Sequence, residues 1–118
     1  MKSAKKPTSY KAGIFAEALA KIILTLKLYR VIASRYKTKS GEIDIIAVQG
    51  KTIIFIEVKK RSNKQELFEA ITKHQQQRIA KAAEIFLIRN QTYSAYSKRF
   101  DAIFISPKLL PVHIKNAW

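Results

Sequence analysis

Two strand-like runs separated by only two residues are the feature that most restricts how this chain can fold. The runs cover residues 42–49 and 52–60, and Gly50 and Lys51 stand between them. A glycine in the first position of a two-residue loop is typical of a type II′ turn, which joins two antiparallel strands into a hairpin. The turn also predicts the register, because the residues flanking the loop face each other and each outward step adds one opposed pair.

This register brings acidic residues together. Counting outward from the loop places Asp44 opposite Glu57 and Glu42 opposite Lys59, and all four side chains leave the sheet on the same side. Opposed carboxylates repel each other unless a cation lies between them, and oxygen ligands without histidine or cysteine suit Mg²⁺ or Mn²⁺. The alternative is an ordinary cross-strand ion pair between Glu42 and Lys59 beside two exposed acids without a function.

The rest of the chain predicts an α/β fold with the element order αβββαβ. Apolar side chains fill the other face of the hairpin, which we expect to be buried against a helix. Residues 1–9 are basic and almost without apolar side chains, so we expect a flexible arm before a single domain over residues 10–118. The predicted elements are a helix over 10–28, a strand over 29–38, the two hairpin strands, a helix over 66–90, a strand over 100–105 and a short edge strand over 112–115.

Charge and composition narrow the function. The chain has 23 Lys and Arg against 8 Asp and Glu, a net charge of +15, which favours nucleic acid as the partner. It contains no cysteine, which excludes disulfides and thiolate metal sites and fits the cytoplasm, and no apolar run suits a membrane span. The side chains expected to hold the nucleic-acid backbone are Arg35, Lys37, Lys39, Lys60, Arg61 and Lys64.

The hairpin sequence also resembles a known family. Residues 41–47 read GEIDIIA and residues 55–61 read FIEVKKR, a combination similar to the metal site of the PD-(D/E)XK nucleases. The chain resembles in particular the YraN-like family of predicted endonucleases, related in fold to archaeal Holliday junction resolvases. This resemblance implies a restriction-endonuclease-like fold, a mixed β-sheet flanked by helices.

By the same resemblance Asp44 and Glu57 are metal ligands and Lys59 is the motif lysine. It further implies catalytic roles for Glu17, on the first helix, and Gln76, on the second. From the residues alone, a pair of Glu17 with Lys21 one helical turn away is the favoured interpretation, and Gln76 can equally be an ordinary surface residue. Arg35 and Gln75 depart from the family pattern, in which asparagine and lysine are expected.

The combined interpretation is a Mg²⁺-dependent or Mn²⁺-dependent endonuclease that hydrolyses phosphodiester bonds of DNA, including branched or structured DNA. The alternative is a non-catalytic nucleic-acid-binding module on the same scaffold. A homodimer is compatible with either. Of the remaining polar residues, Asp101 is predicted to have a structural role, and His74 and His113 are predicted to be solvated.

Overall fold

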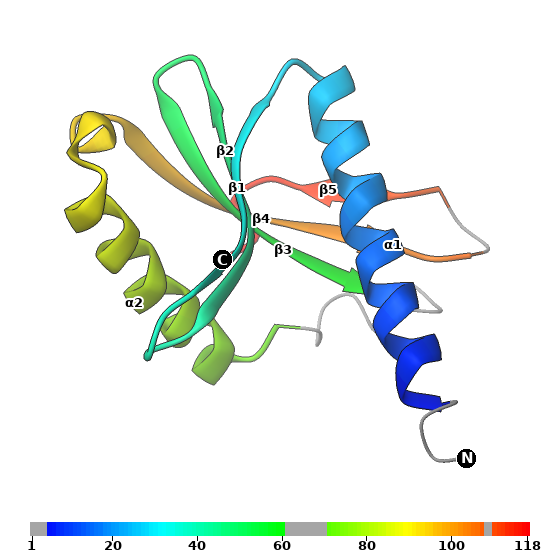
Figure 1. Ribbon diagram of the computed structural model, residues 1–118. Helices are drawn as coiled ribbons and strands as arrows, with labels where there is room; N and C mark the ends of the chain where they lie inside the picture. The colour runs from blue at the N-terminus through cyan, green and yellow to red at the C-terminus, as the bar shows by residue number, and fades with distance from the viewer. Residues whose placement is uncertain (1–4, 61–70, 108–109) are drawn as a thin grey trace.

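The structure is a computed structural model that describes residues 5–60, 71–107 and 110–118, with side chains from Gly13 onward. Its elements confirm the predicted order and the short final strand (Figure 1). They are α1 (Lys5–Leu26), β1 (Arg30–Lys37), β2 (Glu42–Gln49), β3 (Thr52–Lys60), α2 (Lys73–Arg89), the 3₁₀ turn η3 (Gln91–Tyr93), β4 (Ser97–Ile105) and β5 (Val112–Ile114).

The five strands form one mixed sheet in the order β1-β2-β3-β4-β5. Strands β3 and β4 are parallel, whereas the other neighbouring pairs are antiparallel. Parallel neighbours need a long connection across the sheet, and α2 lies on that connection. The α/β fold with a mixed sheet and flanking helices is therefore confirmed.

The two helices cover opposite faces of the sheet (Figure 1). Alternation along β3 divides the core, because Ile54 and Ile56 pack on the side of α1 whereas Ile53 and Phe55 pack on the side of α2. The apolar face of the hairpin is buried as predicted. Ile43 is also buried, but it packs in the core on the side of α2 instead of the side of α1.

The predicted hairpin turn is confirmed. Gly50 has a φ of 60°, as the first position of a type II′ turn requires, and Lys51 is not among the residues with positive φ. The predicted register holds from the pair Gln49 and Thr52 next to the turn outward to Ile45 and Ile56. The regular pairing of β2 with β3 ends at Ile45 and Ile56, so the predicted opposed pairs of Asp44 with Glu57 and of Glu42 with Lys59 are not part of the regular register.

The two helices begin at other residues than apolar periodicity predicts. Helix α1 starts at Lys5, within the stretch of residues 1–9 that the sequence predicts as an arm. Pro7 is tolerated because backbone N–H groups in the first turn have no partner within the helix. Helix α2 starts at Lys73 instead of Glu66, because the side chain of Thr72 caps it by accepting a hydrogen bond from the backbone N–H of Gln75. Residues 61–70 lie outside the described residues.

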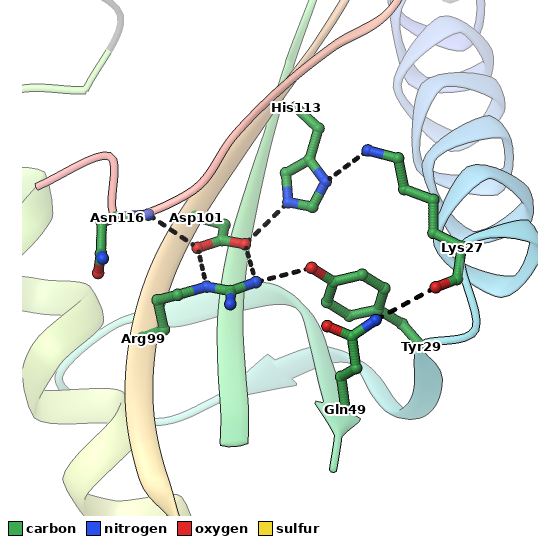
Figure 2. Close-up of polar contacts among 7 residues, drawn as sticks. All are labelled: Lys27, Tyr29, Gln49, Arg99, Asp101, His113 and Asn116. Atoms are coloured by element: carbon green, nitrogen blue, oxygen red, sulfur yellow. Dashed lines mark hydrogen bonds and ion pairs between the residues drawn. The ribbon is translucent and has the colours of Figure 1, made fainter. Parts of the chain in front are cut away.

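A buried polar cluster around Asp101 ties β4 and β5 to the end of α1 (Figure 2). The Asp101 carboxylate accepts hydrogen bonds from Arg99 Nε and Nη2, each at 2.9 Å, and from the backbone N–H of Asn116 at 3.1 Å. Arg99 also donates to the Tyr29 hydroxyl at 2.8 Å. The expectation of a structural Asp101 with an arginine or backbone partner thus agrees with these contacts.

His113 belongs to the same cluster, and the prediction that it is solvated is wrong. Its side chain is only 3% exposed, with Nε2 at 2.8 Å from Asp101 Oδ2 and Nδ1 at 3.1 Å from Lys27 Nζ. An ammonium group only donates, so Nδ1 accepts from Lys27 and Nε2–H donates to Asp101. Although burial opposes ionisation, the hydrogen bonds from His113 and Arg99 keep the pKa of Asp101 below its usual value.

Candidate active site

The three clustered acids line one cleft of about 440 Å³ between the sheet and the start of α2. Its walls are Glu42, Asp44, Glu57, Thr72, His74, Gln75, Arg78 and Ile79. The cleft lies where β2 and β3 cease to pair, and there Asp44 Oδ2 accepts a hydrogen bond of 2.8 Å from the backbone N–H of Val58. The hairpin therefore brings the predicted acids to one cleft, although they lie just beyond its regular register.

Glu57 is held by two donors. Its side chain is 8% exposed, and its Oε2 atom lies 3.2 Å from Lys59 Nζ and accepts a hydrogen bond of 2.8 Å from Gln75 Nε2. Lys59 thus pairs with the acid two residues before it on β3, not with Glu42 across the hairpin. The alternative of a cross-strand Glu42–Lys59 ion pair is not what the structure shows.

In the absence of a cation, the pKa values of both Asp44 and Glu57 are raised. Burial, followed by the negative charge of Glu57, raises the pKa of Asp44 to about 8, and the two carboxyl groups hydrogen-bond each other. Burial also raises the pKa of Glu57, although the ammonium of Lys59 opposes that shift. At neutral pH Asp44 is therefore mostly protonated, so a cation entering the pair displaces a proton.

Glu17 forms an ion pair with Arg35, which we expected from the sequence to contact nucleic acid. Arg35 Nε donates to Glu17 Oε1 at 2.9 Å, so the partner of Glu17 is Arg35 and not Lys21, which was the alternative to a catalytic role. Arg35 has a φ of 51°, so β1 departs from regular alternation at this residue, and Arg35 contacts Glu17 whereas Lys37 and Lys39 line a different cleft. Glu17 still lies close enough to add to the raised pKa of Asp44.

The glutamine that contacts the acids is Gln75, whereas the predicted Gln76 has a backbone partner. Gln76 Nε2 donates to the backbone oxygen of Ile71 at 3.2 Å, whereas Gln75 contacts Glu57. The cap at Thr72 sets the rotation of α2 and therefore which of the two neighbouring glutamines points to the sheet. A capping threonine three residues before Gln75 was the available signal.

Arg78 and His74 line the cleft and were not predicted as site residues. Arg78 Nε donates to the backbone oxygen of Ser40 at 3.1 Å, which ties α2 to the turn between β1 and β2. Gly41 permits this approach, because a Cβ atom there would lie 2.7 Å from the backbone oxygen of Arg78. His74 is exposed, as expected, but at the wall of the cleft.

The remaining predicted nucleic-acid contacts lie in different places. Lys37 and Lys39 line a second cleft, together with Thr38, Ile85 and Arg89. Lys60 lies on the side of α1, in a largely apolar cleft with Phe15. Arg61 and Lys64 fall outside the described residues.

The donor set of the acidic cleft suits a hard divalent cation. Two carboxyl groups that hydrogen-bond each other occupy an open cleft, and Mg²⁺ commonly takes one or two protein carboxylates and keeps several waters. Within the described part of the chain, no three His, Cys, Asp or Glu side chains form a ready metal cage. Asp44 and Glu57 are therefore the pair that would hold the ion.

A mixed sheet with one helix on each face and a carboxylate pair where two strands separate is consistent with the restriction-endonuclease-like α/β fold. Within the described residues, no helix has the length and apolar character that crossing a membrane requires. The chain belongs to the family described as "Uncharacterised protein family UPF0102", whose model matches residues 16–105, and this confirms the resemblance to the YraN-like proteins.

Similar proteins match almost the whole chain. A "UPF0102 protein" of Rhodopseudomonas palustris (strain BisB5) is 43% identical over 114 residues, covering 97% of this chain and 87% of the relative. The UPF0102 protein mlr4633 of Mesorhizobium japonicum is 42% identical over 116 residues, covering 98% and 93% respectively. The UPF0102 protein bll0669 of Bradyrhizobium diazoefficiens is 40% identical over 116 residues, covering 98% and 87%.

Proposed function

We propose that this protein is a divalent-cation-dependent endonuclease that hydrolyses phosphodiester bonds of DNA. The observation that carries the proposal is the pair of neighbouring acids, Asp44 and Glu57, that lines one open cleft of a chain with a net charge of +15. A nucleic-acid-binding surface gains nothing from buried acids that face phosphate, unless a cation reverses their effect. Mg²⁺ or Mn²⁺ is the ion that this oxygen donor set favours.

Each residue around the pair has a role in this proposal. Asp44 and Glu57 would hold the ion, and Gln75 would orient Glu57 through its hydrogen bond of 2.8 Å. A bound divalent cation polarises a phosphodiester and lowers the pKa of a nearby water. Lys59, at 3.2 Å from Glu57, would stabilise negative charge that develops on the phosphate.

Arg78 is the proposed contact for the scissile phosphate. Its guanidinium lines the acidic cleft, and only its Nε has a hydrogen-bond partner among the described residues, the backbone oxygen of Ser40. A guanidinium offers paired donors that match phosphate oxygens. Lys37 and Lys39, together with Lys60, Arg61 and Lys64, would add contacts to the backbone outside the cleft.

A cleavage assay tests the proposal. Linear, flapped and four-way DNA substrates are incubated with the wild type, Asp44→Asn and Glu57→Gln in Mg²⁺ or Mn²⁺, and products are separated on denaturing gels. We expect cleavage by the wild type to fall at least 100-fold in both variants, while DNA affinity stays equal or rises. Equal products from the wild type and both variants would contradict the proposed site. DNA binding without cleavage by the wild type would favour the non-catalytic binding module.

A further inference from the structure

We propose that the cleft formed by Lys37, Thr38, Lys39, Ile85 and Arg89, here termed the basic cleft, is a second binding site for the phosphate backbone of DNA. It measures about 600 Å³, and no acidic residue lines it. This inference rests on the proposed function, since it identifies where the DNA strand that is cut in the acidic cleft continues along the protein surface. It adds Arg89 as a binding residue. It also excludes Arg35 from the group that includes Lys37 and Lys39, because Arg35 pairs with Glu17.

The cations of the basic cleft are available to a ligand. Lys37, Lys39 and Arg89 are exposed, and neither lysine has an ion-pair or hydrogen-bond partner within the part of the chain that the structure describes. Arg89 Nη1 donates to the Tyr36 hydroxyl at 3.3 Å, a contact that holds the guanidinium beside β1. Three unneutralised cations around one cleft match the charge of successive phosphates.

The cleft is held in shape by the turn between β1 and β2. The Thr38 hydroxyl donates to the backbone oxygen of Gly41 at 2.8 Å and accepts hydrogen bonds from the backbone N–H groups of Ser40 and Gly41. The same turn is fastened to α2 through the contact of Arg78 with Ser40. Lys37 and Lys39 therefore project from a turn that is already fixed, which lowers the entropic cost of binding.

The spacing along α2 relates the two clefts. Arg78 lines the acidic cleft, whereas Ile85 and Arg89 line the basic cleft. At about 1.5 Å per helical residue, Ile85 and Arg89 lie roughly 10 to 16 Å beyond Arg78 along the axis. One strand of a duplex advances about 3.4 Å per nucleotide, so this distance corresponds to roughly three to five nucleotides. A single DNA strand can thus occupy both clefts at once.

Salt-dependent binding tests this inference. Fluorescence anisotropy of a 20-base-pair duplex, at several salt concentrations in EDTA, compares the wild type with the double variant Lys37→Gln, Lys39→Gln. The matched control is Lys98→Gln, Lys115→Gln, which removes the same charge from exposed lysines of β4 and the C-terminal end. Since each lost phosphate contact lowers the slope of log K against log salt by about 0.9, we expect the first variant to lose nearly 2 and the control to lose nothing.

A third variant completes the test, because Arg89→Gln removes the remaining cation of the basic cleft and should weaken duplex binding several-fold. Equal slopes for all proteins, or an equal loss in the control, would overturn the basic cleft as a site. Because every measurement is made without divalent cations, a failure of the proposed cleavage activity leaves these outcomes unchanged and is distinguishable from them. Thermal melts confirm that each variant is folded.

Discussion

At the level of single residues, two neighbouring glutamines have different hydrogen-bond partners. Gln75 donates to Glu57 at 2.8 Å, whereas Gln76 donates to the backbone of Ile71. Residues that orient a metal ligand typically contribute 10-fold to 100-fold to metal affinity. Gln75→Ala should therefore weaken Mn²⁺ binding by about tenfold or more, measured by calorimetry. Gln76→Ala is the matched control and should leave the affinity unchanged; equal effects of both would show that the hydrogen bond to Glu57 is irrelevant.

The raised pKa of Asp44 makes the metal-free protein sensitive to pH. The folded protein holds a proton on Asp44 up to about pH 8, whereas an unfolded aspartate loses it near pH 3.8. The stabilising effect of this proton is complete below about pH 4 and is lost as the pH rises toward 8. Asp44→Asn lacks this loss, so in EDTA it should match the wild type near pH 4 and exceed its stability at pH 9 by several kcal/mol, because each unit of pKa difference corresponds to about 1.4 kcal/mol.

Urea denaturation across this pH range measures the difference. Glu42→Gln serves as the control, because it removes an exposed acid from the same cleft. If the wild type is as stable as Asp44→Asn at pH 9, burial and repulsion do not act on Asp44 as the geometry indicates.

The end of α1 provides a test at the level of the element. Leu28 has a φ of 71° and is 84% exposed, and the backbone N–H of Tyr29 donates to the oxygen of Leu24 at 2.9 Å, as in a helix that closes with a left-handed residue. Glycine adopts this conformation without strain, so Leu28→Gly should raise the free energy of unfolding by about 1 kcal/mol. Leu26→Gly, at a helical position that is 77% exposed, should lower it by about as much.

Thermal denaturation of both variants compares these effects. A loss of stability in Leu28→Gly would mean that the exposed leucine side chain contributes more than its backbone conformation costs.

For the molecule as a whole, the sequence predicts what local chemistry controls and misses what distant contacts control. The turn at Gly50 determines the register of β2 and β3, so the meeting of Asp44 and Glu57 could be predicted. The direction of the Arg35 side chain could not be predicted, because it depends on the positive φ of Arg35 and on its contact with Glu17. The burial of His113 could not be predicted either, because its partners Asp101 and Lys27 come close to it only in the folded chain.

Calorimetric titration of Mn²⁺ into the wild type and Asp44→Asn at pH 6, 7 and 8 tests the central claim, that Asp44 and Glu57 form a divalent-cation site. Each titration is repeated in buffers of different ionisation enthalpy, which reports how many protons are released. We expect one ion to displace nearly one proton at pH 7 and affinity to rise by up to about tenfold per pH unit until about pH 8, because the ion competes with the proton on Asp44. Asp44→Asn should bind at least 100-fold more weakly. Binding by the wild type without proton release, or unchanged in Asp44→Asn, would contradict the account.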